Sequence, residues 1–438
     1  MFCLLRVFKL ITQMLVALFN LLRGKSIGYC VKVLSANMGL AYIKLAQILA
    51  MQDLRDLFTE RDRKDIAAIC DAVNPVPLRA IRNQLPGHLL KDIKHVDKKP
   101  TGAASISQVH RAVLCDGTVV AIKIKRKDVE RNLLFDVKCL KVLMFIFGPV
   151  FGFSNRIGGN CALNYYYRWV LQEVDFVREH QNIIDYSKFA ESVNGKVAGC
   201  VNIVTPKVYS QYCTDSVIVM EYIEHKTLNQ HTYSREVVNK ALNSYVQLNF
   251  WALLHNRPVV FHGDPHPGNI YIDDNGSIGF LDMGLVFGMN AYVVADVRQL
   301  FLCAYFGNAD TLCKILVSWF HGSTRQFNKF TEEVKHYCKY LHARPITAYF
   351  MDLATVCKRY PIEPASYLYE LAKAFVCLDG FGNVYTPDQT GYQLLLQQVT
   401  DYCVENGVKQ GTEFLRALVH KDIPSALDIL YSVKELRL

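Results

Sequence analysis

Residues 260–269 read Val-Phe-His-Gly-Asp-Pro-His-Pro-Gly-Asn and carry the strongest chemical signal of the chain. Asp264 and Asn269 lie five residues apart on this proline-rich loop, and Asp282 follows thirteen residues after Asn269. Phosphoryl transfer needs a carboxylate that orients or deprotonates the acceptor, and oxygen ligands for the Mg²⁺ that bridges the phosphates. The spacing therefore predicts Asp264 as the base and Asn269 and Asp282 as metal ligands.

An alternative interpretation is that these residues only form turns, because Asp-Pro and Asp-Asn-Gly are frequent in turns. Chance turns do not explain the combination of His two residues before Asp264, Asn five residues after it, and Asp-x-Gly eighteen residues after it. The combination favours a phosphotransfer site.

Such a site also needs a cation on the phosphates. Two β-rich runs, residues 108–114 and 118–125, flank the turn Cys-Asp-Gly and predict a hairpin. The second run contains Val-Ala-Ile-Lys, which ends at Lys123 in the pattern of a phosphate-pairing lysine. Lys125 shares the face of Lys123, so the assignment to Lys123 depends on the motif and not on the alternation of the strand.

An acid that holds this lysine is expected on a helix, and residues 163–189 have a helical pattern. Glu173, Asp175 and Glu179 fall within it, and Asp175 and Glu179 share a helix face. A solvated acidic stripe is the alternative interpretation.

The remaining pattern predicts an α+β fold of two lobes, protein-kinase-like, with a helical N-terminal extension and a helical C-terminal lobe. Residues 1–98 look helical and are interrupted by prolines, 216–222 form a strand, 269–282 form a second hairpin, and a helical tail runs to residue 438. The expected domains are the extension 1–98, an N-lobe 99–224 and a C-lobe 225–438. The apolar residues 140–153, which include Gly and Pro, predict a buried helix and turn.

Charge and cysteine usage narrow the class of protein. The net charge is +9, but the first 52 residues contain six basic residues and no acid, which leaves 43 basic and 40 acidic residues for the rest. This distribution argues against a nucleic-acid-binding body and for a cationic N-terminal arm that contacts anionic lipid, with an ordinary solvated basic face as the alternative. The 14 cysteines are scattered without C-x-x-C pairs or zinc-ligand spacing, as expected for free thiols in a reducing compartment.

The first 23 residues predict an amphipathic helix. Its uncharged stretch, residues 10–22, is too short to span a bilayer, so a peripheral helix in the membrane plane is favoured. Packing of the apolar face on the protein's own core is an equal alternative, and an organellar targeting arm is a weaker one. The polar positions, which gather within about a third of the helical circle, are Arg6, Lys9, Thr12, Gln13, Asn20 and Arg23.

Four motifs together make the chain resemble the UbiB family of atypical kinases, which is linked to ubiquinone (coenzyme Q) biosynthesis. The resemblance covers roughly residues 35–290, and we expect it to extend to the end of the chain. The motifs are K-x-G-Q (here Lys-Leu-Ala-Gln, 44–47), an alanine-rich phosphate loop (102–110), E-x-D within E-x-D-[FY]-x-x-E-x-x-N (173–182) and H-x-D-P-H-P-G-N (262–269).

The resemblance implies ATP or ADP and Mg²⁺ as cofactors and assigns further roles. Lys44 and Gln47 would occupy the pocket where a protein kinase takes its peptide, with Lys44 near the carboxylates of Glu173 and Asp175. Glu179 would pair with Lys123. The remaining nucleotide contacts would come from Ala103, Ala104 and Ser105 in the phosphate loop and from the backbone at Glu221 and Tyr222 around the adenine.

The family also implies a place and partners. We expect a peripheral protein on the cytoplasmic face of a bacterial inner membrane, or on the matrix face of a mitochondrial membrane. Membrane lipids, polyprenyl quinone precursors and other ubiquinone-biosynthesis proteins are the expected partners. Residues 425–438 are too charged and short for the C-terminal hydrophobic span of many bacterial relatives, so attachment would depend on the N-terminal helix or a partner.

Three departures from the family pattern affect these expectations. Ala46 replaces the glycine of K-x-G-Q and removes access to positive φ, which would displace Gln47 if the motif formed a turn. Gly102 replaces the first alanine of the loop and loosens it. Met283 stands after Asp282 where Phe is usual, and Met can fill that packing role.

Two other function classes remain open at this level. A small-molecule phosphotransferase of the aminoglycoside or choline kinase type shares the H-G-D-x-x-x-x-N loop, but the 44–47 segment and the alanine-rich loop argue against it. A nucleotide-binding scaffold with little turnover is the other class, and the intact catalytic positions argue against it.

Overall fold

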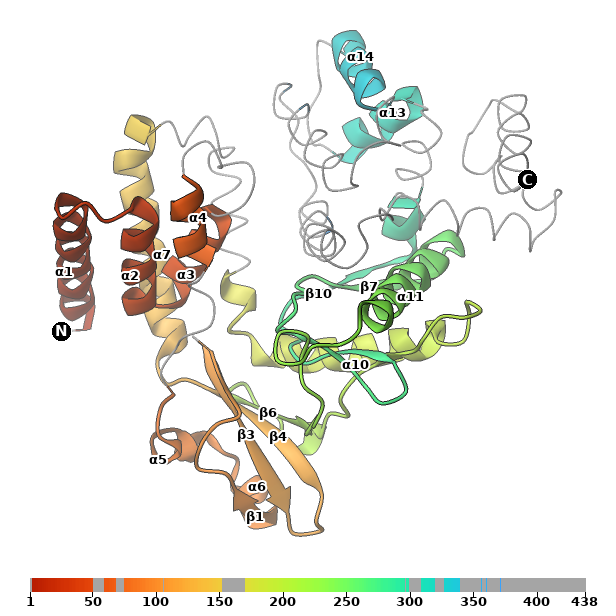
Figure 1. The fold of residues 1–438 in the computed structure, drawn as a ribbon, viewed down its shortest axis with the longest axis horizontal. Helices are drawn as coiled ribbons and strands as arrows, with labels where there is room; N and C mark the ends of the chain where they lie inside the picture. Colours follow the sequence, from red (N-terminus) through yellow and green to blue (C-terminus); the bar gives the residue numbers. More distant parts are fainter. Residues whose placement is uncertain are drawn as a thin grey trace. The chain divides into compact units, whose positions relative to one another are not determined.

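The computed structural model describes residues 2–49, 59–67, 75–104, 106–151, 170–295, 297–298, 309–319, 327–338, 356, 360 and 371 (Figure 1). The chain forms two compact units. The first comprises Met1–His180 with Lys207–Ile223, and the second comprises Gln181–Pro206 with Glu224–Leu438. The division falls within one helix, α10 (Phe176–Val193).

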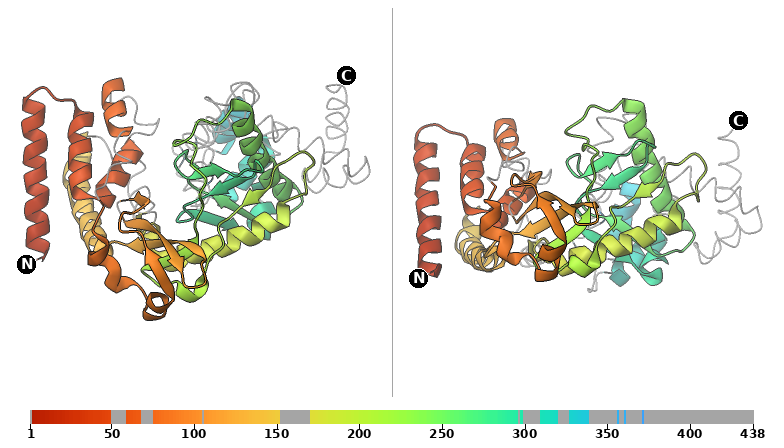
Figure 2. Two further views of the ribbon diagram at one scale, coloured as in Figure 1. Left: turned by 60° about the horizontal axis from the view of Figure 1, so that its bottom comes forward. Right: turned by 90° about the horizontal axis from the view of Figure 1, so that it is seen from below.

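A group of helices opens the first unit. It contains α1 (Phe2–Leu22), α2 (Ile27–Met38), α3 (Leu40–Leu49), α4 (Glu60–Ala67) and the later helix α7 (Val129–Phe151). The Ser26 side chain caps α2 by accepting a hydrogen bond from Tyr29 N at 3.0 Å, and Gly39, with φ +103°, separates α2 from α3. α2 packs against α1, α3 and α4, and α1 lies on the outer side of the group (Figures 1 and 2).

An antiparallel sheet forms the rest of the first unit. Its strand order is β1 (Ile93–Val96), β3 (Ser107–Leu114), β4 (Val119–Lys125), β6 (Val217–Glu221), and β2 (Gly102–Ala103) pairs with β3. Short helices α5 (Leu78–Ile81) and α6 (Gly87–Asp92), with the 3₁₀ turn η2 (Arg82–Gln84), cover one face. The core between them contains Ile81, Leu85, Leu89, Ile122, Ile124 and Val219. This face anchors β4 and so fixes the strand that carries Lys123.

The second unit contains most of α10, α11 (Arg235–Leu254), α13 (Ala309–Trp319) and α14 (Phe327–Cys338). Its strands form two small sheets: β5 (Ile203–Val204), β9 (Ile278–Phe280) and β8 (Ile270–Ile272) in one, and β10 (Val286–Met289) with β7 (Val259–His262) in the other. Tyr186 of α10, Tyr245 of α11 and Phe280 of β9 are fully buried and in ring contact. They hold the β8–β9 hairpin against both helices.

Several predictions made from the sequence are confirmed. The predicted hairpin 108–125 is β3 and β4, the strand 216–222 is β6, and the second hairpin is β8 and β9. The α+β, protein-kinase-like fold class is also confirmed. Most of the predicted helical tail lies outside the described residues, and the three-domain division stays a prediction. Six described cysteines, Cys30, Cys115, Cys139, Cys200, Cys213 and Cys313, are free thiols.

Other predictions are wrong. The region 1–98 is not wholly helical, because residues 93–96 form β1 against β3. The helix predicted over 163–189 is interrupted at residues 173–175, where a turn precedes α10. No turn begins at Gly148 and Pro149, since α7 continues to Phe151.

Candidate active site

The catalytic loop follows β7 and is closed by its own backbone. His266 N donates to Asp264 O at 2.9 Å, and Asn269 N donates to His266 O at 2.8 Å. Gly263 N donates to Leu285 O at 2.8 Å, and a Cβ at Gly263 would lie 2.8 Å from Leu285 Cγ. The loop therefore packs too closely on Leu285, the residue before β10, for a larger side chain at position 263. Asp264 stands half-buried at its start.

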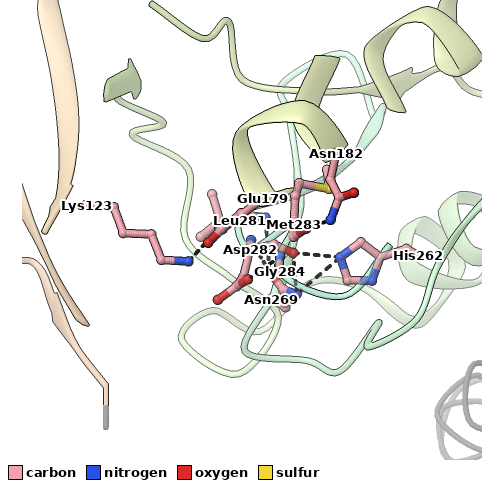
Figure 3. Close-up of polar contacts among 9 residues, drawn as sticks. All are labelled: Lys123, Glu179, Asn182, His262, Asn269, Leu281, Asp282, Met283 and Gly284. Carbon is pink, nitrogen blue, oxygen red and sulfur yellow. Dashed lines mark hydrogen bonds and ion pairs between the residues drawn. The ribbon is translucent and has the colours of Figure 1, made fainter. Parts of the chain in front are cut away.

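Asn269 connects this loop to the segment that carries Asp282 (Figure 3). Its Oδ1 accepts hydrogen bonds from Asp282 N at 2.6 Å and Leu281 N at 3.1 Å. Its Nδ2 donates to Asp282 O at 3.1 Å and to Asp264 O at 3.3 Å. Asn269 is buried. In this orientation both lone pairs of Oδ1 are used by backbone amides, so a metal would compete with them for that oxygen.

His262 contacts the main chain of the same two segments, the Asp264 loop and the segment that carries Asp282. It is fully buried, its Nε2 lies 2.7 Å from Asp282 O, and Asp264 N donates to its Nδ1 at 3.1 Å. These contacts require a neutral ring with the proton on Nε2. Burial lowers the pKa of His262 to about 4, although Asp264 and Asp282 oppose this shift. Sequence reasoning gave His262 a place in the motif but no role.

Asp282 is exposed, and one of its carboxylate oxygens accepts a hydrogen bond from Gly284 N at 2.8 Å. Met283 is buried, so it fills the packing position expected of it. Asn182 of α10 donates to Met283 O at 2.8 Å (Figure 3). This contact was not foreseen either, although Asn182 ends the longer motif E-x-D-[FY]-x-x-E-x-x-N. Side chains thus hold the main chain on both sides of Asp282.

In the first unit, Lys123 forms a buried ion pair with Glu179. Nζ lies 2.5 Å from Glu179 Oε1, and the two side chains are 5% and 3% exposed (Figure 3). Lys125 instead pairs with Glu130 at 2.6 Å. Both ammonium groups lie over the Phe176 ring, at 5.5 Å for Lys123 and 4.9 Å for Lys125. The structure thus distinguishes the two lysines, which strand alternation alone left equivalent.

The acids before α10 lie outside the helix. Asp175 caps it, since its Oδ1 accepts a hydrogen bond from Arg178 N at 3.0 Å. Glu173 is half-buried in the preceding turn, which is closed by Val174 N to Leu171 O and Asp175 N to Gln172 O. The cap is why the expected shared helix face of Asp175 and Glu179 is absent.

The alanine-rich loop forms a narrow hairpin on β3. Ala103 of β2 pairs with Gln108, and Ala104 N donates to Ser107 O at 2.8 Å. Ser105 lies outside the described residues. The buried Gln108 side chain exchanges two hydrogen bonds with the Val76 backbone, at 2.9 and 2.8 Å, and so fastens the end of the N-terminal extension to this sheet.

At the predicted adenine position, the backbone amides are already engaged. Glu221 N donates to Lys207 O at 2.7 Å, and Tyr222 N donates to Val119 O at 3.5 Å. Recognition of adenine by these two residues would therefore depend on their backbone carbonyl oxygens and not on these amides.

The K-x-G-Q-like segment lies in α3, where the side chains of Lys44 and Gln47 are outside the described residues. Ala46 is buried and packs with Ile43 and Ile66. Since residue 46 is inside a helix, positive φ is not required there, and alanine suits the position better than glycine. The concern that Ala46 displaces Gln47 therefore does not apply in this fold.

The chemistry of the donors fits Mg²⁺ bound together with a nucleotide. Among the described residues no group of three or more His, Cys, Asp and Glu side chains could hold a metal. Mg²⁺ usually takes only one or two protein carboxylates and completes its shell with phosphates and water. Asp282 and Asn269 supply oxygens of the required kind.

These features define a protein-kinase-like phosphotransferase class: a strand lysine paired with a helix glutamate in one unit, and a His-x-Asp loop with Asp-x-Gly in the other. The ABC1 atypical kinase-like domain matches residues 69–316, more than half of the chain. The chain belongs to this ABC1 family of atypical kinases, which includes the UbiB proteins, as the resemblance predicted.

Individual relatives have low sequence identity to this chain. A "Probable protein kinase UbiB" of Shewanella sp. (strain ANA-3) is 24% identical over 404 residues, covering 87% of this chain and 70% of that protein. An uncharacterized chloroplastic aarF domain-containing protein kinase of Arabidopsis thaliana is 32% identical over 258 residues, covering 57% and 46%. The chain spans about half the length of several such curated relatives. The solved structure of Rv3197 from Mycobacterium tuberculosis with erythromycin is 19% identical, with a TM-score of 0.46, and covers 80% of this chain and 91% of that one.

Proposed function

We propose that the protein is an ATP-dependent phosphotransferase or ATPase that binds a Mg-nucleotide and supports ubiquinone biosynthesis at a membrane. The observation that carries the proposal is the buried pair of Lys123 and Glu179 at 2.5 Å. Burying two charges is costly unless they are well paired, and this pair has the arrangement that kinases need for phosphate binding.

The proposed roles combine the motif positions with the contacts described above. Lys123 binds the nucleotide phosphates, with Glu179 fixing its ammonium group. Asp264 orients or deprotonates the acceptor. Asp282, and Asn269 once its Oδ1 leaves the backbone amides, would hold Mg²⁺, which neutralises charge on the phosphates. His262 binds the main chain of Asp264 and Asp282 and keeps these two carboxylates in register.

The proposed substrate class is a polyprenyl quinone precursor or similar lipid, which the protein modifies or extracts from the membrane. Support comes from the names of the UbiB relatives and from the family's four motifs. Other ubiquinone-biosynthesis proteins are proposed partners. The proposed location is the cytoplasmic face of a bacterial inner membrane or the matrix face of a mitochondrial membrane.

The test is turnover of radiolabelled ATP by purified protein, with and without phenolic quinone-precursor mimics in anionic vesicles. We expect Mg²⁺-dependent ADP release, with or without label on the mimic, and a loss of at least 100-fold in Asp264→Asn. The matched control is Asp274→Asn, the same change on an exposed turn, which should behave like wild type. Nucleotide binding without turnover would favour the scaffold. Labelling of water-soluble amino alcohols or aminoglycosides in place of the mimic would favour the small-molecule kinase class.

A further inference from the structure

The helix α1 carries a large apolar surface that faces outward from the helical group. Among the described residues, its segment Leu4–Leu22 is the one helix long and apolar enough to cross a membrane, yet only 6% of it is buried. With the exception of Leu5, the large apolar side chains of α1 that are at least half exposed recur at helical spacing on one face. They are Leu4, Phe8, Ile11, Leu15, Leu18, Phe19 and Leu22, and their exposed fractions run from 51% to 80%.

The side of α1 that touches the protein is a narrow stripe of mixed character, with Leu10 buried and Arg6 and Gln13 half-buried. Arg6 pairs with Asp136 of α7 and donates to Met38 O at 2.6 Å. Gln13 Oε1 accepts a hydrogen bond from Asn37 of α2 at 2.9 Å. Apart from Leu10, the large apolar side chains of α1 face away from the protein, whereas an amphipathic helix usually buries its apolar face against its own protein. The alternative that the apolar face packs on the protein's own core is therefore wrong for all of its large side chains except Leu10, and Arg6 and Gln13 are engaged within the protein.

The body beneath α1 excludes a membrane-spanning position. α2, on which α1 rests, packs in turn on α4, whose sequence Glu-Arg-Asp-Arg-Lys-Asp-Ile-Ala is almost entirely charged. Asp62 of α4 accepts a hydrogen bond from Gly28 N of α2 at 2.6 Å. A bilayer around α1 on all sides would have to cover this charged neighbour, which is energetically prohibitive. α1 can meet a bilayer along its outward face alone.

Charge decides between a bilayer and a second copy of the chain as the occupant of that face. Lys9, Arg23 and Lys25 are exposed along or just after the helix, and no acid precedes Asp53 in the sequence. The Arg23 guanidinium lies over the Phe19 ring, 4.3 Å from its centre, so a positive charge borders the exposed apolar face. Two copies meeting through α1 would bring like charges together, whereas an anionic lipid surface complements them.

We propose that α1 lies in the plane of an anionic bilayer, with Phe8, Leu15 and their neighbours among the acyl chains and the side that touches the protein holding the folded body at the surface. This deepens the membrane location in the proposed function and is independent of the nucleotide chemistry. The recognised partner is the lipid surface itself, through apolar contact and negative headgroup charge.

Vesicle flotation tests this surface separately from turnover. Purified full-length protein should float with vesicles of phosphatidylcholine and phosphatidylglycerol, and less with phosphatidylcholine alone. Phe8→Glu/Leu15→Glu should reduce the floated fraction at least tenfold. Val237→Glu/Tyr292→Glu makes the same charge change at two exposed apolar residues outside α1 and should float like wild type.

Circular dichroism melting and ATP turnover without vesicles should be unchanged in both variants, which separates this surface from the active site. Equal flotation of wild type and Phe8→Glu/Leu15→Glu would overturn the proposal. So would a wild-type dimer in light scattering that this variant converts to monomer without change in flotation, since the occupant would then be a second copy.

Discussion

Asn269 holds the main chain of Asp282 at both its polar groups: Oδ1 accepts from Asp282 N at 2.6 Å, and Nδ2 donates to Asp282 O at 3.1 Å. The side chain expected to bind a metal thus also fixes the segment that carries the second metal ligand. The two roles can be tested separately, because an aspartate at position 269 would remain a good Mg²⁺ ligand but would lack the Nδ2 donor.

The change Asn269→Asp separates these roles. It removes the Nδ2 donor and sets a negative charge against Asp282 O and Asp264 O, so we expect turnover to fall at least tenfold and stability to fall by about 1–3 kcal/mol. Urea denaturation and a Mg²⁺ titration of ATP turnover measure both effects. The control Asn275→Asp alters a neighbouring turn whose side chain takes no part in the site. Wild-type stability and turnover in Asn269→Asp would show that the contact to Asp282 is dispensable.

The buried His262 should make the stability of the folded protein depend on pH. Its pKa of about 4 in the folded protein is below the unfolded value of 6.5, so the unfolded chain binds more protons as the pH falls. Stability is fully present above about pH 6.5 and is lost as the pH falls through 4, by up to about 3 kcal/mol from this residue.

Urea denaturation between pH 7 and pH 4.5 measures this loss. His262→Gln keeps a donor for Asp282 O without titrating, so its stability should depend less on pH than that of wild type. His231→Gln, at an exposed site, should keep the wild-type slope. The same slope in wild type and His262→Gln would mean that the ring is not held neutral.

Substitutions in the Lys123–Glu179 ion pair should affect stability and activity differently. Lys123→Met leaves a buried carboxylate without its ammonium partner, so we expect a loss of about 3–5 kcal/mol. Lys123→Met/Glu179→Leu should regain most of that stability, because apolar residues of similar volume replace the whole pair. Turnover should be absent in both variants. Thermal unfolding and ATP hydrolysis decide this, and a double variant that hydrolyses ATP would remove Lys123 from the mechanism.

Gln108 links the N-terminal extension to the phosphate-loop hairpin through its two hydrogen bonds with Val76. Gln108→Glu replaces the group that donates to Val76 O with a buried negative charge, and should lower stability by about 2–3 kcal/mol. Gln211→Glu, the same change at an exposed residue, should have little effect. Protease sensitivity near residue 76 should rise in Gln108→Glu alone. If Gln108→Glu were as stable as Gln211→Glu, the hydrogen bonds between Gln108 and Val76 would not stabilise the protein.

The sequence was sufficient where residue types and spacing define a structure locally. The β3–β4 hairpin, its lysine and the Asp264 loop each lie within one short segment, so turn chemistry and motif spacing identified them. The break before α10 was missed because a helical periodicity does not reveal that Asp175 caps the helix.

Contacts between distant segments were not accessible in this way. The bonds of Asn269 to Leu281 and Asp282 form only when the β8–β9 hairpin closes, and the tautomer of His262 depends on the backbone of two loops. For α1, the pattern showed which side of the helix is polar. It did not show that Arg6 on that side would pair with Asp136, 130 residues away, while most of the apolar residues stay exposed.

We propose that Asp282 and its neighbours support the turnover of a Mg-nucleotide. Single-turnover ATP hydrolysis by wild type, Asp282→Asn and the control Asp274→Asn across a range of Mg²⁺ concentrations tests this role. We expect Mg²⁺-dependent hydrolysis in wild type and Asp274→Asn, and a loss of at least 100-fold in Asp282→Asn that saturating Mg²⁺ does not restore. Hydrolysis by Asp282→Asn at the wild-type rate and with the same Mg²⁺ dependence would exclude Asp282 as a metal ligand in turnover.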